Sequence, residues 1–453
     1  MRRAGTVDAR LVVVTVICAS GGLTLAEGGA AASFESAVAL PRTVRVSVTS
    51  HEAESRAASR ELDISANGRY VAFTSSAAGL VRGDTNQRAD VFVRDRATGV
   101  TRRVSLTTGG QQANGPSFDP AISADGRHVA FVSAAGNLVA GDSNGTNDVF
   151  VRDLANKVTR RVSIRSDGAQ AYRHGSSFQP AISADGQYVA FTSVAPNLVP
   201  GDTNYSADVF VRDRVQKVTE RVSVGTGGVQ AIGGNDPYSS VPAISSDGCD
   251  VAFESHATDL FPNDNNQSSD VFVRHRCEDL TERVSVALGG SDADSWSNDP
   301  DISADGQFVG FQSSASNLVM LDENDVADVF VRDLATQQTE RVSIASDQSE
   351  ADAASAEVAV SADGRYIAFE SHATNLVESD LNHVRDVFIR DRLAGLTERV
   401  SVAREGAEAN GRSIQPAVSA HGRYVAFMSK ASNLIRRDTN GVNDVFVRVR
   451  GAG

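Results

Sequence analysis

Short runs of Val, Ile, Ala and Phe alternate with polar turns along most of the chain. In one stretch, 120–123 (PAIS) is short and apolar, 124–126 (ADG) is a turn, and 127–133 (RHVAFVS) is rich in β-branched and aromatic residues. Two more such runs follow at 148–153 (DVFVRD) and 159–164 (TRRVSI). No apolar period of 3.6 residues persists for three turns, so the pattern predicts strands rather than helices.

This four-strand unit occurs seven times. An apolar residue followed by Ser-x-x-Gly and the motif Asp-Val-Phe both recur at steps of 58, 60, 62, 58, 58 and 58 residues. Arg-Val-Ser also recurs seven times, first at Arg45. A repeat of this length is typical of solenoids, propellers and arrays.

The repeat predicts a closed propeller. Four antiparallel strands that are apolar on both faces form a blade, because each sheet packs against two neighbours. The first Arg-Val-Ser precedes the first complete unit, and the last Asp-Val-Phe, at Asp444, has none after it. We therefore predict an all-β fold: a single seven-bladed β-propeller of four-stranded antiparallel blades over 42–450, in which the N-terminal strand completes the last blade and removes free edges.

The motifs resemble those of a known family. Ser-Ala-Asp-Gly (361–364), Tyr-Val-Ala-Phe (188–191), Asp-Val-Phe-Val-Arg-Asp (208–213) and Thr-Glu-Arg-Val-Ser (219–223) are similar to TolB-like, WD-repeat-like propeller repeats of bacterial exported proteins. The resemblance covers all seven units and implies a β-propeller with a protein-binding or scaffolding role. TolB itself has six blades and a separate N-terminal domain, features that this sequence does not predict. Some TolB-like propellers are polysaccharide lyases with a His-held metal, which gives an enzymatic alternative.

The first 32 residues differ in character from the rest. Arg2, Arg3 and Arg10 give a positive start, an apolar run follows at 11–18, and small residues lead to Ala32. This pattern predicts a secretory signal peptide over 1–32; the alternative is a single N-terminal membrane anchor. We expect a secreted or periplasmic protein that does not insert into the membrane once the signal is removed.

Two cysteines remain outside this leader, Cys249 and Cys277. In an oxidising compartment they predict one disulfide, because a zinc site needs more ligands. The alternative is two free thiols in adjacent strands.

The charge limits the partners. Lys and Arg total 43 against 57 Asp and Glu, a net charge of −14. An acidic chain with no Lys- or Arg-rich block repels phosphate backbones and anionic membranes, so we expect no nucleic-acid partner. We expect a monomer.

The most regular polar feature is Asp-x-Asn-x-x-x-Asp before the third strand. It comprises Asp84, Asn86 and Asp90; Asp142, Asn144 and Asp148; Asp202, Asn204 and Asp208; Asp264, Asn266 and Asp270; Asp322, Asn324 and Asp328; Asp380, Asn382 and Asp386; and Asp438, Asn440 and Asp444. The spacing is similar to the start of a calcium-binding loop, which makes structural Ca²⁺ one hypothesis. The alternative is a set of Asx turns, whose side chains bond to loop N–H groups.

A single binding site must break the symmetry of the repeat, so residues that depart from the repeat are its candidates. The aromatic residues outside repeat positions gather in loops of blades three to five, with charged and polar neighbours: Tyr172, Arg173, His174, Tyr205, Asp236, Tyr238, Phe261 and Trp296. Connections before the first strand and between the second and third strands emerge on one face, so these residues are expected to share a rim. Aromatic side chains among polar groups suit contact with a protein or a polysaccharide. The alternative is that each aromatic packs against its own blade.

Signals for catalysis are weak. The sequence contains no Gly-x-Ser-x-Gly, no His-Glu-x-x-His and no Gly-rich phosphate loop. The loop histidines on the predicted rim face, such as His51 and His174, belong to separate blades. The leading hypothesis is therefore an exported binding or scaffold module, and the alternative is a carbohydrate-active lyase or hydrolase on the same face.

Overall fold

The repeated Asp-Val-Phe run forms a strand that is covered on both faces. In β8 (Asp148–Asp153) all six residues are buried, because neighbouring sheets pack against each side. The computed structural model describes residues 41–234, 237–262 and 264–451, and within these ranges it contains strands and turns but no helix.

Seven four-stranded antiparallel sheets, the blades, follow one another along the described residues. Their innermost strands are β2 (Ser59–Ile64), β6 (Ser117–Ile122), β10 (Ser177–Ile182), β16 (Ser239–Ile244), β20 (Ser297–Ile302), β24 (Ser355–Val360) and β28 (Ser413–Val418). The second strands are β3 (Tyr70–Ser75), β7 (His128–Ser133), β11 (Tyr188–Ser193), β17 (Asp250–Ser255), β21 (Phe308–Ser313), β25 (Tyr366–Ser371) and β29 (Tyr424–Ser429).

The outer half of each blade holds the two remaining strands. Besides β8, the third strands are β4 (Asp90–Asp95), β12 (Asp208–Asp213), β18 (Asp270–His275), β22 (Asp328–Asp333), β26 (Asp386–Asp391) and β30 (Asp444–Val449). The outermost strands are β5 (Val100–Arg103), β9 (Val158–Arg161), β13 (Val218–Arg221), β19 (Leu280–Arg283), β23 (Gln338–Arg341), β27 (Leu396–Arg399) and, in blade seven, β1 (Arg42–Arg45). A short hairpin of β14 (Val224–Gly225) and β15 (Val229–Gln230) follows blade three.

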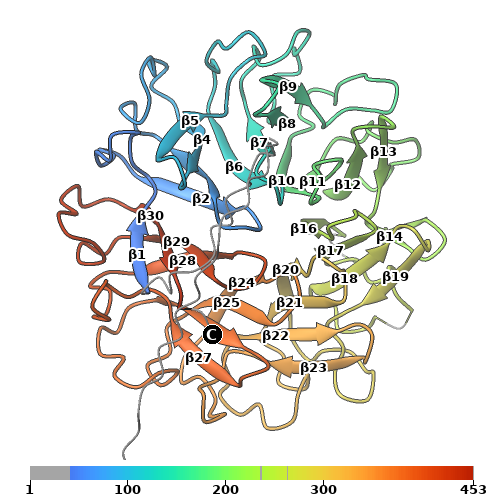
Figure 1. The fold of residues 1–453 in the computed structure, drawn as a ribbon. Coiled ribbons are helices and arrows are strands. Elements are labelled where there is room, and N and C mark those ends of the chain that lie inside the picture. Colours follow the sequence, from blue (N-terminus) through green and yellow to red (C-terminus); the bar gives the residue numbers. More distant parts are fainter. Residues whose placement is uncertain (1–40, 235–236, 263, 452–453) are drawn as a thin grey trace, which may run out of the picture. The chain divides into compact units, whose positions relative to one another are not determined.

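The N-terminal strand closes the ring, as predicted. β1 pairs with β30, so that Arg45 lies opposite Phe446, and Figure 1 shows blue β1 beside red β30. The hydroxyl of Ser47 donates a 2.6 Å hydrogen bond to Asp444, which is fully buried. The predicted all-β, seven-bladed propeller is confirmed.

The apolar core is divided among the seven interfaces between blades. At each interface, two stacked phenylalanines of one blade face small apolar side chains of the preceding blade. Between blades one and two, Phe131 and Phe150 lie 5.9 Å apart between ring centroids and belong to the same cluster as Val91. Between blades seven and one, Phe73 packs in a cluster with Val445. Because each buried phenylalanine contributes about 2–3 kcal/mol, the ring is stabilised at every interface.

Two strands differ from their predicted bounds. β6 begins at Ser117, three residues earlier than predicted, and continues through a bulge at Asp119, where φ is 54° and the register against β7 shifts. β9 ends at Arg161, three residues earlier than predicted. There the hydroxyl of Ser163 turns inward and donates to Asp148 instead of extending the ladder.

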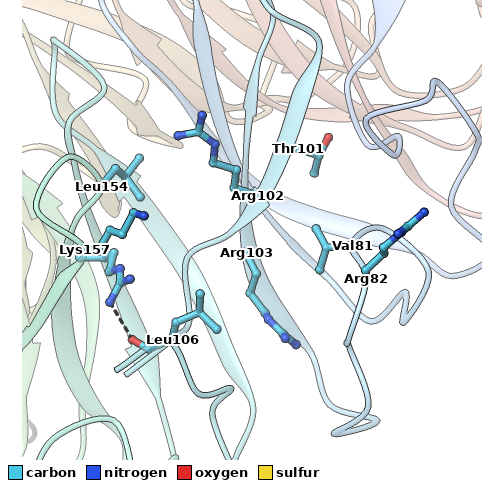
Figure 2. Close-up of a pocket in the computed structure, with 10 residues that line it drawn as sticks. Val81, Arg82, Thr101, Arg102, Arg103, Leu106, Leu154 and Lys157 are labelled. Atoms are coloured by element: carbon cyan, nitrogen blue, oxygen red, sulfur yellow. Dashed lines mark hydrogen bonds between the residues drawn. The ribbon is translucent and has the colours of Figure 1, made fainter. Parts of the chain in front are cut away.

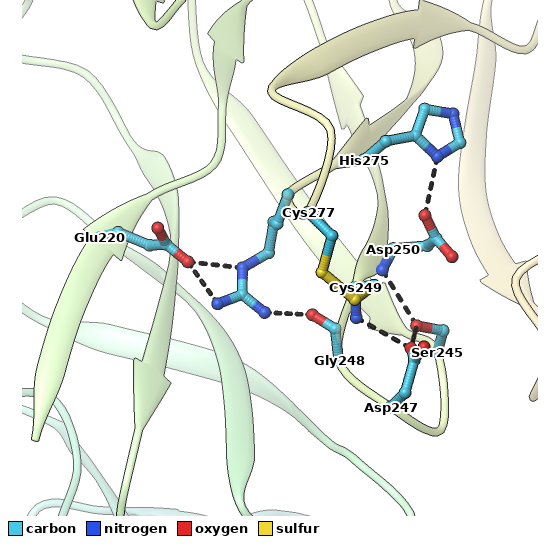
Figure 3. Close-up of a disulfide and its surroundings, with 9 residues drawn as sticks. Glu220, Ser245, Asp247, Gly248, Cys249, Asp250, His275 and Cys277 are labelled. Carbon is cyan, nitrogen blue, oxygen red and sulfur yellow. Dashed lines mark hydrogen bonds and ion pairs between the residues drawn. A yellow bond between two sulfur atoms is a disulfide. The ribbon is translucent and has the colours of Figure 1, made fainter. Parts of the chain in front are cut away.

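Blade four contains a disulfide between Cys249 and Cys277 (Figure 3). It joins the chain just before β17 to the chain just after β18, and the two Cα atoms lie 5.4 Å apart. Nearby, His275 lies 2.7 Å from Asp250 between Nδ1 and Oδ1. Both features connect neighbouring strands of one blade.

Residues 39–453 form one compact unit. Nowhere in the described part of the chain is there a helix with the length and apolar character that a membrane crossing needs. The predicted signal peptide, 1–32, lies outside the described residues.

Candidate functional site

The seven Asp-x-Asn loops share one hydrogen-bond pattern. In blade two, the side-chain oxygen of Asn144 accepts a 3.3 Å bond from the N–H of Thr146, which is an Asx turn. The Asn144 amide nitrogen donates to Asp148, and the Ser163 hydroxyl donates to the other oxygen of that carboxylate. The equivalent Asx turn occurs in all seven blades.

An arginine supplies the positive charge of each loop. In blade two the Nη1 atom of Arg161, from the repeated Arg-Val-Ser, lies 3.0 Å from both Asp142 and Asp148. Burial raises the pKa of Asp142, and the charge of Arg161 lowers it. The corresponding pKa rises to about 6 in four other blades, at Asp202, Asp264, Asp322 and Asp380. The sequence showed this arginine as a repeat marker but not as the partner of the two carboxylates.

This donor set favours the Asx-turn alternative over calcium. Ca²⁺ needs six to eight oxygen ligands, whereas here the amide oxygen binds a backbone N–H and both carboxylates face a guanidinium. Among the described residues no group of three or more His, Cys, Asp or Glu side chains is arranged to hold a metal ion. Structural calcium therefore stays a prediction, and the loops fit it poorly.

The predicted aromatic sector lies in two kinds of loop, those before a blade and those between its second and third strands, and hydrogen bonds join these loops on one face. The N–H of Tyr172, before blade three, donates a 3.0 Å bond to Asn197, between the second and third strands of that blade. The backbone N–H of His256 donates to the carbonyl of Tyr238, and the backbone N–H of Ser314 donates to the carbonyl of Trp296. The loops that precede a blade and the loops within it therefore emerge together.

The sector divides into exposed and half-buried residues. Tyr172 and Tyr205 are 62% and 90% exposed, and Arg173 and His174 are also exposed. The half-buried aromatics pack on their own surroundings, as the alternative interpretation expects: Tyr238 stacks on His256, Arg283 lies over Phe261, and Trp296 is partly covered. Asp236 lies outside the described residues. The exposed part of the sector is thus centred on blade three.

A second polar region, missed in the sequence, lies along the innermost strands. Each of these strands bulges at a residue with positive φ: Glu61, Asp119, Gln179, Val241, Asp299, Glu357 and Gln415. Five of these seven N–H groups bond to side chains of the preceding blade, such as Asp119 to Glu61 at 2.9 Å and Gln179 to Asp119 at 3.0 Å. Burial raises the pKa of Asp119 to about 6, and that of Glu357 to about 7.

Two further carboxylates face this region, Asp63 and Asp301. They stand where the other five units have alanine, and each accepts a 2.7 Å bond from a backbone N–H of the next blade. Burial, with a smaller contribution from the charge of Asp301, raises the pKa of Asp63 to about 7. The replacement of alanine by aspartate at these two positions was a signal in the sequence for the buried carboxylates along the innermost strands.

Comparisons with known proteins support the fold. No protein-family model and no curated protein matches the chain. An oligogalacturonate lyase in complex with manganese is similar in structure, with a TM-score of 0.53, 12% identity, and coverage of 90% of this chain and 92% of that one. The β-propeller domain of the Trilobed protease from Pyrococcus furiosus has a TM-score of 0.52 at 12% identity, covering 86% of this chain and 93% of that one.

TolB from Acinetobacter baumannii is a more distant match, with a TM-score of 0.39 at 13% identity, covering 85% of this chain and 82% of that one. A match that weak carries no argument about this chain. At 12% identity, the two stronger similarities show the fold alone. The chain is a seven-bladed β-propeller, the fold that its TolB-like repeat motifs predict.

Proposed function

We propose that the protein is an exported binding module that contacts a protein or a glycan through the loop face at blades three to five. The observation that carries this proposal is the exposure of Tyr172 and Tyr205, two aromatics that depart from the repeat. Tyrosine offers an apolar ring and a polar hydroxyl at low cost in side-chain entropy, which suits recognition.

Two features support this proposal. Tyr205 is held in an Asx-turn loop with a left-handed φ of 57°, so the loop presents its side chain in a defined position. The disulfide between Cys249 and Cys277 suits an oxidising compartment, in agreement with export.

The test is a glycan array and an affinity capture with the wild type and the Tyr172→Ala/Tyr205→Ala variant. The matched control is Val215→Ala/Leu393→Ala, because these side chains are also exposed but lie in turns at the opposite ends of the blades. We expect ligands that the wild type and the control retain and that the tyrosine variant loses. Identical ligand profiles for all three proteins would contradict the proposal.

A further inference from the structure

The outermost strands are connected by ion pairs that repeat around the ring. A glutamate in the Thr-Glu-Arg motif of one blade pairs with an arginine that follows the third strand of the next blade. In one such pair, Arg450 Nε lies 3.1 Å from Glu398 Oε2. The pairs are Glu220 with Arg276, Glu340 with Arg392, and Glu398 with Arg450.

Between blades two and three this pair is replaced by two like charges. Arg160 stands where those blades have glutamate, and the residue opposite it is still an arginine, Arg214. The Nε atom of Arg214 is buried and has no hydrogen-bond partner among the described residues, whereas Nε of Arg276 donates to Glu220. Burial lowers the pKa of Arg214, and the charge of Arg160 lowers it further. Arg214 thus lacks the glutamate partner that Arg276, Arg392 and Arg450 have, although the charges of Asp153 and Asp185 partly offset the fall in its pKa.

A second charge reversal occurs in the same two blades. In the turn after the third strand, blades four and five carry Asp279 and Gln337, which bond to the arginine of their Val-Arg motifs. Blades two and three carry Lys157 and Lys217 at that position. Both lysines are exposed, so each of these turns carries a cation where blades four and five have a side chain that bonds to an arginine and blades one and six have Gly99 and Gly395.

These reversals line two neighbouring grooves. The groove between blades one and two has a volume of about 620 Å³, and its basic lining residues are Arg82, Arg102, Arg103, Arg152 and Lys157. The groove between blades two and three has about 460 Å³, with Arg160, Arg161, Arg212, Arg214 and Lys217. One carboxylate lines the second groove, Asp167, and it pairs with Arg165 at 2.9 Å. Arg103 and Arg161 pair with the aspartates of their own loops, but the other eight cations have no ion pair among the described residues. In a chain of net charge −14, both grooves are therefore basic.

The two grooves lie on either side of β9 and share blade two. Figure 2 shows Arg102 and Lys157 near Leu154 in the first groove. Arg102 and Arg160 are exposed, and neither has a hydrogen bond or ion pair within the described ranges. Apolar side chains line the space between the cations, namely Val81, Leu106 and Leu154 in the first groove and Val162 and Ile164 in the second.

We propose that these two grooves, the basic rim, bind an acidic polysaccharide that crosses β9 and places carboxylate or sulfate groups beside Arg102, Lys157, Arg160 and Lys217. Arginine and lysine recognise such groups through charge-assisted hydrogen bonds. A sugar ring also has an apolar face, which fits the apolar lining of both grooves.

The chemistry favours a polysaccharide over the other polyanions. Single-stranded nucleic acids bind by stacking bases on aromatic side chains, and no described residue that lines either groove is aromatic. An acidic peptide that bound by strand addition would need a distinctive edge, but the edge of β9 has the same length and pairing as those of the other blades. A peptide held by the cations alone is distinguished by the poly-glutamate arm of the test below. What changes at blades one to three is the charge of side chains.

The test measures binding of fluorescent alginate, dextran sulfate and neutral dextran to the full chain by anisotropy at about 50 mM salt. The test variant is Arg102→Glu/Arg160→Glu, which introduces the residue that four other blades carry. The matched control, with the same change in charge, is Arg404→Glu/Arg412→Glu, at two exposed arginines just before blade seven that have no ion pair in the described structure. We expect at least about ten-fold weaker binding for the double variant and less than about two-fold change for the control.

Comparison of the two acidic polymers shows which anionic group the grooves bind. Preference for alginate assigns carboxylates to the ligand, and preference for dextran sulfate assigns sulfates. No binding, equal binding of neutral dextran, or equal loss in the control would overturn the proposal. Tighter binding of poly-glutamate or of a single-stranded oligonucleotide of matched charge would overturn the polysaccharide class.

This inference goes beyond the proposed function, because the basic rim lies on the outer strands rather than on the loop face. The Tyr172→Ala/Tyr205→Ala variant keeps all of the cations in both grooves. It should therefore bind the acidic polymer as the wild type does, so either proposal can fail without the other.

Discussion

Blade four and the basic rim both depart from the repeat, but the departures in blade four add stabilising bonds whereas those at the basic rim remove them. In blade four the departures add bonds: a disulfide joins Cys249 to Cys277, and His275 contacts both Asp250 and Glu282. At the basic rim the departures remove them, since Arg160 faces Arg214 where other blades have an ion pair. A departure from the repeat that adds bonds is explained by the stability it gives. A departure that leaves cations unpaired costs stability, and binding of an anionic ligand would explain it. The second kind is therefore the better guide to function.

The largest effect should come from the strand that closes the ring. Deleting 42–50 removes β1, exposes the edge of β30, and leaves the buried Asp444 without Arg45 and Ser47. We expect aggregation or a large fall in melting temperature, measured by light scattering and calorimetry. Deleting 1–32 is the control. A truncated protein as stable and monomeric as its parent would contradict closure of the ring by β1. It would also contradict the idea that the residues repeated in every blade stabilise the fold.

The disulfide should have the next largest effect. The bond closes a loop across 28 residues of separation, so Cys249→Ser/Cys277→Ser should lower the unfolding free energy by about 3 kcal/mol. Denaturant unfolding measures this, with Glu278→Ser as control. Two reactive thiols in the denatured, unreduced protein would show that the bond is not formed, and blade four would lose its largest added bond.

The His275 contacts should give a pH-dependent contribution. Hydrogen bonds to Asp250 and Glu282 raise the pKa of His275 to about 9, above its unfolded value of 6.5. The stabilisation is therefore complete below pH 6.5 and lost as pH rises through 9, an effect on the order of 2–3 kcal/mol. Unfolding free energies from pH 6 to 10 should show this loss in the wild type and in a His51→Asn control. A His275→Asn variant with the same pH profile as the wild type would contradict it.

Calcium should have the smallest effect. Because Arg161 and its equivalents already form ion pairs with both aspartates of each loop, we expect equal melting temperatures in chelator, millimolar Ca²⁺ and Mg²⁺. A rise that is specific to Ca²⁺ and that shrinks in Asp142→Asn/Asp148→Ala would restore the calcium hypothesis. It would place a metal in a loop that all seven blades share, and it would not change the difference between blade four and the basic rim.

The fold could be predicted from the sequence because its signals are repeated seven times. Three markers fixed the blades, and the unpaired Arg-Val-Ser at Arg45 revealed the closure. The candidate sites were harder to predict, because they depend on what lies opposite a residue in the next blade. The change from Glu to Arg at Arg160 was visible in the sequence, but its meaning required Arg214, which lies in another unit. Likewise, Tyr172 and Tyr238 looked equivalent until their exposure was known.

If unpaired cations mark a recognition site, a single substitution should raise stability and weaken binding together. Arg160→Glu should pair with Arg214, as Glu220 pairs with Arg276, and add up to about 1 kcal/mol of stability. In the same samples, its affinity for the acidic polysaccharide should fall by about ten-fold or more. We expect a melting temperature at or above that of the wild type together with weaker binding. A lower melting temperature, or unchanged binding, would contradict it.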